Sequence, residues 1–175
     1  MKIKCTLMLA VTFCAMSIAG TPVEDNVQNL SLGYQGMING EFLQGVSLRS
    51  WRTERKGWEI NLYHAFVEIE YGSSDVDGQL LLLEGKYLHG LKIRDNSKFY
   101  FGLSGGFGQA WSSDADDDLE IYWARPLIGA EYFFNEIPEI GFNFEVGYGY
   151  SGFSIDEDSL QLIGIGVNLG VHYYF

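Results

Sequence analysis

The chain has 175 residues, with 11 Lys and Arg against 23 Asp and Glu and a formal net charge of −12. This acidic balance argues against nucleic acid as a partner, because nucleic-acid binding needs a basic surface. Aromatic residues make up 15% of the chain, which has 22 glycines but only 3 prolines. The length fits one domain, so the excess of aromatic residues and glycine requires a structural explanation.

The first residues have the features of an export signal. Two lysines precede an apolar run over residues 6–18, and residues 17–19 supply the small side chains that a signal peptidase reads. The run is shorter than the roughly 18 apolar residues that a membrane-spanning helix needs. We therefore predict that residues 1–19 are a cleaved signal peptide and that residues 20–175 form a single domain.

Both cysteines, Cys5 and Cys14, lie in this predicted signal, so the mature chain would have no disulfide. Lipidation of Cys14 is a minor alternative, since Phe13 stands where lipoprotein signals carry a small residue. Cleavage would leave nine Lys and Arg against 23 Asp and Glu, a formal charge of −14.

A hydrophobic period of two predicts eight β-strands. In chain order they cover residues 27–38, 42–52, 58–71, 76–89, 98–111, 119–134, 140–150 and 163–175. The third loses its phase near His64 and Ala65, which indicates either a β-bulge or a strand that leaves the membrane there. In the fourth, residues 80–83 are all leucine, and Glu84 and Lys86 define the inward parity.

The last two predicted strands show the pattern most clearly. In residues 140–150, apolar or aromatic residues at even positions alternate with glycine, asparagine and glutamate at odd positions. Residues 163–175 repeat the pattern with the parities exchanged. A soluble β-protein would place charged side chains and threonine on its outward face rather than repeated glycine. We therefore predict that the apolar face contacts lipid and that the small and polar face lines the interior.

Eight antiparallel strands of this kind predict an all-β, eight-stranded antiparallel up-and-down transmembrane β-barrel. The barrel must close, because no backbone N–H or C=O can face lipid unpaired. With both termini in the periplasm, the outer connections are the hairpin signal Asn39-Gly40 and residues 72–78, 112–118 and 152–159. The periplasmic connections are residues 53–57, 90–97 and 135–139. Acidic residues gather in the first set and basic residues near the second.

The C-terminus resembles the targeting signal of outer-membrane barrel proteins, which has a polar residue, a glycine two later, then a hydrophobic and a terminal aromatic residue two apart. Asn168, Gly170, Tyr173 and Phe175 match these positions. The resemblance implies that the barrel-assembly machinery recognises this strand. Residues 27–175 as a whole resemble the small eight-stranded outer-membrane barrels of the OmpX and OmpA-membrane-domain kind. We therefore predict a monomer in the bacterial outer membrane, in contact with outer-membrane lipids and lipopolysaccharide.

The predicted interior contains charged side chains of both signs. The inward candidates are Arg49, Glu59, Glu84, Lys86, Arg125, Glu131, Glu145 and His172. Side chains just fill an eight-stranded barrel, so we favour a salt-bridged plug over the alternative of a narrow ion path.

No catalytic, cofactor-binding or metal-ligating residue is predicted. A lipid A deacylase of barrel architecture has a serine two residues after a histidine, but Phe66, Leu91 and Tyr174 stand two residues after the three histidines. Convergent active sites need no such adjacency, so a lipid-modifying enzyme stays an alternative. A small surface adhesin is the other, although the outer connections are short.

Two further motifs are interpreted as structural. Residues 147–152, GYGYSG, fit a phosphate-binding glycine pattern, but no helix follows, so we expect Gly147, Gly149 and Gly152 to face the lumen. Residues 114–120, DADDDLE, lack the glycine that a calcium loop needs at its sixth position. We expect a solvated loop there, with weak cation bridging to lipopolysaccharide as the alternative.

Overall fold

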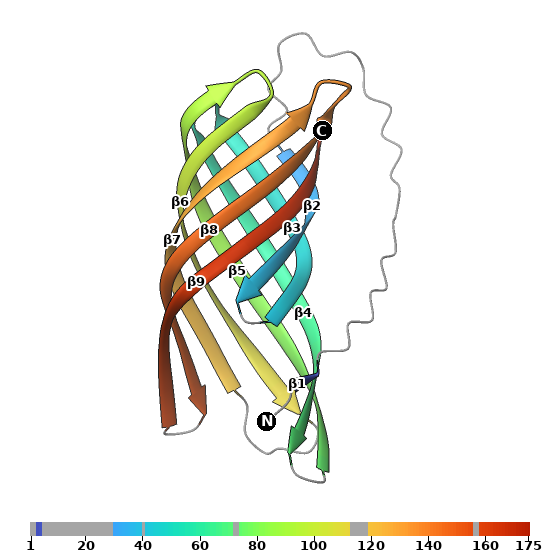
Figure 1. Ribbon diagram of the computed structural model, residues 1–175, viewed down its shortest axis with the longest axis vertical. Helices are drawn as coiled ribbons and strands as arrows, with labels where there is room; N and C mark the ends of the chain where they lie inside the picture. Colours follow the sequence, from blue (N-terminus) through green and yellow to red (C-terminus); the bar gives the residue numbers. More distant parts are fainter. Residues whose placement is uncertain (1–2, 5–29, 40, 72–73, 113–118, 156–157) are drawn as a thin grey trace.

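Eight long strands close into a single barrel (Figure 1). The computed structural model describes residues 3–4, 30–39, 41–71, 74–112, 119–155 and 158–175. The strands are β2 Leu30–Asn39, β3 Glu41–Thr53, β4 Lys56–Tyr71, β5 Ser74–Arg94, β6 Ser97–Ser112, β7 Leu119–Phe134, β8 Ile137–Ile155 and β9 Asp158–Tyr174. Each pairs antiparallel with the next, and β9 pairs with β2. The predicted all-β, eight-stranded up-and-down barrel is confirmed.

A short strand, β1 (Ile3–Lys4), is additional to the eight barrel strands. It pairs with β4, with Ile3 opposite Ile69 and Lys4 opposite Glu68. The apolar run at residues 6–18 lies outside the described residues, so cleavage of residues 1–19 stays a prediction. No helix in the described part of the chain is long and apolar enough to cross a membrane.

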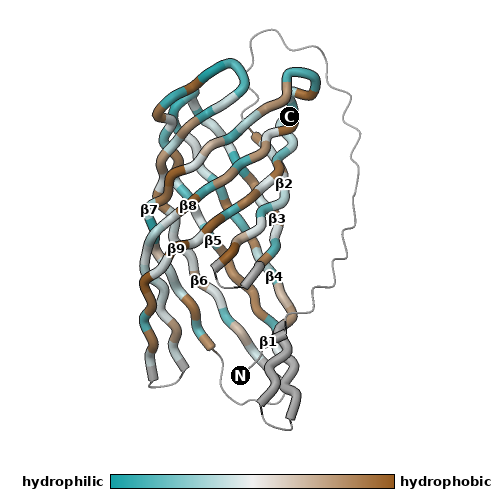
Figure 2. Tube along the Cα trace, in the orientation of Figure 1, coloured by the Kyte–Doolittle hydropathy of each residue, from teal (hydrophilic) through white to brown (hydrophobic). Residues whose placement is uncertain are grey.

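The two faces of the wall have the distribution predicted from the period of two. Large apolar side chains cover the outside, among them Phe107, Ile128 and Phe144, which are 64%, 66% and 50% exposed. Figure 2 shows hydrophobic and hydrophilic residues alternating along the strands. The inside holds most of the buried polar and charged residues. This distribution is the reverse of that in a soluble protein and fits a wall surrounded by lipid.

One end of the barrel is closed by three two-residue turns, and we call it the turn end. The turns are Glu54-Arg55, Asp95-Asn96 and Asn135-Glu136. They are shorter than the predicted connections at residues 53–57, 90–97 and 135–139, because the strands continue further. The register shifts next to each turn, between Trp51 and Thr53, Gly90 and Lys92, and Phe133 and Phe134. Such bulges increase the local twist and allow tight turns.

At the opposite end, which we call the loop end, most strands also extend beyond the prediction, although β4 and β7 stop there at the predicted residues. Only residues 40, 72–73, 113–118 and 156–157 separate them, and these lie outside the described residues. The acidic loop predicted at residues 114–120 falls mostly within that set.

The bulge considered at His64 and Ala65 is wrong. β4 pairs with β5 without a register shift along its whole length. Tyr63 and Ala65 are buried inside, and His64 and Phe66 are exposed outside. The side chains therefore continue to point alternately inward and outward. Only the hydrophobic pattern of the sequence is interrupted, because alanine and histidine are neither clearly apolar nor clearly polar. Likewise, the parity set by Glu84 holds through the leucines at residues 80–83.

The barrel wall is lower on one side of the loop end. β2 and β3 have 10 and 13 residues, whereas the other strands have 16 to 21. Pairing between β2 and β9 stops at Ile38 and Val167, and pairing between β3 and β4 stops at Gly45 and Tyr63. Beyond these points β9 and β4 continue without the short hairpin between them (Figure 1). We call this feature the notch.

We predict that a charge on the outer face destabilises the protein. Phe144 lies near the middle of β8 and is 50% exposed on the lipid face. Phe144→Arg should lower the free energy of unfolding in lipid vesicles by about 2–4 kcal/mol, as expected near the bilayer midplane. Urea titration of the refolded protein measures this, with Phe144→Leu as an apolar control. Equal effects of the two substitutions would show that this face does not contact lipid.

Candidate functional site

The lumen contains all eight charged or titratable residues that the sequence placed inside. None is more than 6% exposed, and five are fully buried. They come from β3, β4, β5, β7, β8 and β9. Burying this many charges is unfavourable unless each is paired and hydrogen-bonded. Their contacts therefore decide what the lumen can do.

Arg49 joins three carboxylates from three different strands. Its guanidinium pairs with Glu59 of β4. Nη1 lies 3.2 Å from Oε1 of Glu131, and Nη2 lies 2.8 Å from Oε1 of Glu145. The planar fork of an arginine offers five N–H donors in fixed directions, which suits several partners at once.

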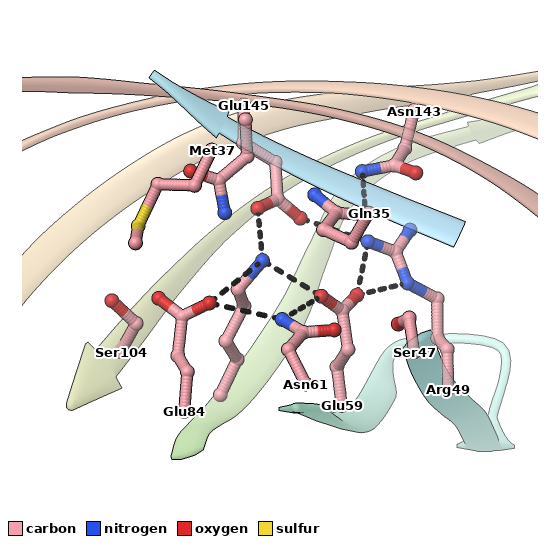
Figure 3. A network of polar contacts seen from close by, with 12 residues as sticks. Gln35, Met37, Ser47, Arg49, Glu59, Asn61, Glu84, Ser104, Asn143 and Glu145 are labelled. Carbon is pink, nitrogen blue, oxygen red and sulfur yellow. Dashed lines mark hydrogen bonds and ion pairs between the residues drawn. The ribbon is translucent and has the colours of Figure 1, made fainter. Parts of the chain in front are cut away.

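Lys86 provides a second cation among the carboxylates of Glu59, Glu84 and Glu145, which are labelled in Figure 3. Its Nζ lies 2.7 Å from Oε1 of Glu59 and 2.6 Å from Oε2 of Glu145. Oε2 of Glu84 is 3.6 Å away. Glu59 and Glu145 each contact both Arg49 and Lys86, so the ion pairs form one connected network rather than separate pairs.

Arg125 extends the network from β7. Its Nη2 lies 2.9 Å from Oε1 of Glu84 and donates to Oδ1 of Asn168 at 2.9 Å. Its Nε donates to Oγ of Ser104 at 3.1 Å. Asn61 connects the two parts, because its Nδ2 donates to Glu59 at 2.7 Å and to Glu84 at 2.9 Å.

Aromatic side chains donate hydrogen bonds to the same carboxylates. Tyr63 donates to Glu84 at 2.9 Å, Tyr100 to Glu145 at 2.8 Å and Tyr174 to Glu131 at 2.5 Å, and Trp51 Nε1 donates to Glu131 at 3.0 Å. Sequence reasoning did not identify these partners. Bulky side chains with polar tips at inward positions were the available signal, since such groups usually find a partner when buried.

His172 is also fully buried, but its nearest polar contact is neutral. Its Nε2 lies 2.8 Å from Oγ of Ser47. The side chain forms no ion pair with a carboxylate in the described part of the protein. Its predicted position in the lumen is confirmed.

Inward glycines make room for these long side chains. A Cβ on Gly129 would lie 2.6 Å from the ring of Tyr100, and one on Gly166 would collide with the guanidinium of Arg125. At the glycines that the sequence predicted to face the lumen, a large side chain from a neighbouring strand therefore packs directly over the glycine. Gly147 and Gly149 follow this rule, but the expectation for Gly152 is wrong. Gly152 lies on the outer face, where a Cβ would meet the ring of Tyr122.

An apolar cluster lies on each side of the polar network. Towards the loop end the cluster consists of Met37, Tyr63, Ala65, Leu80, Leu82 and Trp123. Towards the turn end it consists of Trp51, Leu88, Tyr100, Leu127 and Tyr174. Charged side chains therefore occupy the middle of the lumen, and apolar side chains fill the sections above and below them.

The structure assigns local roles to two of the four residues that match the targeting signal. Asn168 bonds to Arg125 in the lumen, and Gly170 lies where a Cβ would collide with Gln35 and Asn143. Tyr173 and Phe175 instead point outward and are 54% and 55% exposed. Packing in the lumen therefore explains Asn168 and Gly170. It does not explain Tyr173 and Phe175, whose side chains point away from the lumen.

The described residues contain no cluster of three His, Cys, Asp or Glu side chains suited to a metal ion. His64 and His89 pack edge-on or tilted against Phe66 and Phe101, at 4.9 and 5.4 Å between ring centroids. His172 lies in the lumen, apart from both.

No family model and no curated protein matches the chain. Among solved structures, it is similar to Ail, the attachment invasion locus protein of Yersinia pestis, solved in complex with the heparin analogue sucrose octasulfate. The identity is 16%, the match covers 84% of this chain and 97% of that one, and the TM-score is 0.51. Neisserial surface protein A matches at 14% identity over 84% and 95% of the two chains, with a TM-score of 0.48. The N-terminal barrel domain of Pseudomonas aeruginosa OprF matches at 18% identity over 83% and 98%, with a TM-score of 0.44.

We predict that removing one lumen cation destabilises the barrel strongly. Lys86→Met leaves its carboxylate partners without an ammonium group, and breaking a buried ionic cluster costs about 3–5 kcal/mol. Urea unfolding in vesicles measures the loss. Lys92→Met is the matched control, because Lys92 is an exposed cation on the same strand; its change should stay below about 1 kcal/mol. A Lys86→Met protein as stable as the control would show that the network does not stabilise the fold.

Proposed function

Because the chain has the fold of the small eight-stranded outer-membrane β-barrels, we propose that it is an integral protein of the bacterial outer membrane with a structural or surface role and no catalytic activity. The observation that carries this proposal is the lumen, where the charged side chains are engaged with one another. Charged groups that are paired and buried in this way are not free to attack or bind a substrate.

The outer surface supports the location. Apolar and aromatic side chains surround the wall, and aromatic residues lie on the outer face towards both ends, such as Tyr122 and Tyr150 near the loop end and Phe134 and Phe142 near the turn end. Aromatic girdles of this kind occur at the two interfaces of membrane barrels. The predicted signal peptide fits export to the same membrane. Membrane lipids and lipopolysaccharide would then be the protein's immediate surroundings.

The lumen also favours a plug over an ion path. An ion crossing the barrel would have to separate Arg49 and Lys86 from their carboxylates and then pass two apolar clusters. Charge removed from its partners in a low-dielectric interior is strongly unfavourable.

We predict no stable single-channel steps when the refolded protein is inserted into a planar bilayer in molar salt. The reason is the filled lumen, since larger barrels are needed for an aqueous channel. A porin reconstituted in the same way provides the positive control. Reproducible conductance steps that scale with the amount of protein inserted would show that the plug interpretation is wrong.

A lipid-modifying enzyme is the first alternative. His64 lies on the outer face near the middle of β4, where lipid could reach it, but the serine expected two residues later is Phe66. Mass spectrometry of lipopolysaccharide incubated with the refolded protein decides between the two proposals. An unchanged number of acyl chains supports the non-enzymatic role, and loss or gain of a chain supports the enzyme.

A small surface adhesin is the second alternative. Ail has been solved with a heparin analogue, which is an anion. In this chain the segments at the loop end, residues 39–42, 67–78, 111–120 and 152–160, contain no Lys or Arg. A polyanionic ligand therefore does not suit this end, and any adhesive role would need a different class of partner.

We further propose that the barrel-assembly machinery recognises the last strand through Asn168, Gly170, Tyr173 and Phe175. The support is that Tyr173 and Phe175 are exposed on the outer face. The backbone N–H of Phe175 donates to the carbonyl of Leu30 at 3.0 Å, so the strand pairs up to the last residue.

We predict that Phe175→Ser slows insertion in cells, so that unfolded chain accumulates in the periplasm, while the purified variant refolds normally in detergent. The exposed ring contributes little to lumen packing, which separates targeting from stability. Pulse-labelling followed by protease sensitivity measures assembly in cells, and the gel shift on heating measures folding in detergent. If the variant fails both to assemble in cells and to fold in detergent, Phe175 contributes to packing. If it does both normally, Phe175 has no role in recognition.

A further inference from the structure

In the part of the barrel that the structure describes, the notch exposes two strand edges, one on β9 and one on β4. Within the described residues, β9 pairs only with β8 over residues 158–166. Among the residues that the structure describes, β4 has no β3 partner over residues 64–71, and only Glu68 and Ile69 are paired on that side, by β1. A free edge presents unpaired N–H and C=O groups and is a template for another strand.

The free part of β9 is also apolar on the face that elsewhere lines the lumen. Leu160 and Leu162 have the inward parity, yet they are 58% and 50% exposed. Asn168 and His172, at the same parity where β2 is present, are 2% and 0% exposed. The inner face therefore changes from buried to exposed where β2 ends, and the side chains there are large aliphatic groups.

An occupant of the notch must satisfy both features. A lipid acyl chain would cover Leu160 and Leu162, but it has no groups that could pair with the backbone of the edge. An extended peptide does both, because its backbone adds to the sheet while alternate side chains lie against the leucines. The structure already contains such an arrangement, since β1 pairs antiparallel with the β4 edge.

The width of the notch limits the size of the occupant. Beyond the ends of β2 and β3, the space that two further strands would fill lies between β9 and β4. The two strands are therefore about three strand spacings apart, roughly 14 Å. One extended segment or one hairpin fits this width. A second barrel does not, because its own neighbouring strands would collide with the wall.

Charge indicates the composition of the segment. Of the nine Lys and Arg after residue 19, Arg49, Lys86 and Arg125 lie in the lumen and the other six lie at or near the turn end. The four loop-end segments carry thirteen acidic residues and no basic ones. A basic partner is attracted to this end, and an acidic one is repelled.

We propose that the notch binds an extended basic peptide segment, which adds as an antiparallel strand to the free edge of β9 and places its apolar side chains over Leu160 and Leu162. This assigns the protein a peptide-binding surface at its loop end, which goes beyond a structural role. It does not depend on whether the lumen conducts ions.

The probe is a fluorescent peptide of about eight alternating lysine and isoleucine residues, a usual length for an added strand. It is titrated onto the refolded mature protein, residues 20–175, in zwitterionic detergent, and hydrogen exchange is followed across β9. We expect saturable binding and slower exchange of amides in residues 159–165. A peptide of alternating glutamate and isoleucine should not bind, and N-methylation of alternate backbone amides should abolish binding of the basic peptide.

Leu162→Lys and Gln161→Lys form a matched pair of variants. They add the same charge at adjacent positions, but Leu162 has the inward parity and Gln161 the outward one. Because both side chains are exposed, each variant should keep its heat-dependent gel shift. Leu162→Lys should weaken peptide binding about tenfold or more, as loss of one buried leucine does, and Gln161→Lys should weaken it much less.

Equal weakening by the two variants, or equal binding of the N-methylated peptide, would overturn the proposal, because binding would then be electrostatic adsorption only. Protection, without peptide, of those amides in residues 159–165 that do not donate to β8 would also overturn it and would indicate that detergent chains fill the notch. A concentration-dependent dimer with the same protection would indicate a second copy of the chain.

Discussion

The pairing of the Arg49 guanidinium with three carboxylates is the interaction on which the interior depends. Its partners come from β4, β7 and β8, so a single side chain connects opposite parts of the wall. A slip of one residue in any of these strands would move a charge into lipid and leave its partner unpaired inside. The network therefore fills the lumen and also fixes the register of the strands. An apolar core of the same volume would specify that register less strictly.

The two faces of the wall stabilise the protein in different ways. Outside, any large apolar side chain serves, because lipid is a non-directional solvent. Inside, size and hydrogen-bonding geometry are specific: Gly129 must be small because Tyr100 crosses over it, and Tyr100 must reach Glu145. This difference explains why one chain is rich in both glycine and aromatic residues.

The two ends also differ. The turn end has short turns, basic side chains and an apolar cluster that fills the lumen there. The loop end is acidic in sequence and has a notch where β2 and β3 stop early. The turn end is tightly packed and the loop end has free strand edges. This difference is consistent with a protein that interacts with partners at its loop end. Loops and edges can vary there without disturbing the closed network below them.

The sequence by itself determined the strand number, the inverted faces and the eight charged or titratable residues of the lumen, because side-chain direction in a strand depends only on local parity. It did not determine which charges meet. Arg49 lies 10 residues from Glu59 but 82 and 96 from Glu131 and Glu145, and such pairings depend on how tilted strands stagger around a closed barrel. The aromatic donors, the absence of a bulge at His64 and the notch follow from the same global register. Only the tertiary structure decided them, since they depend on where each strand stops relative to its neighbours.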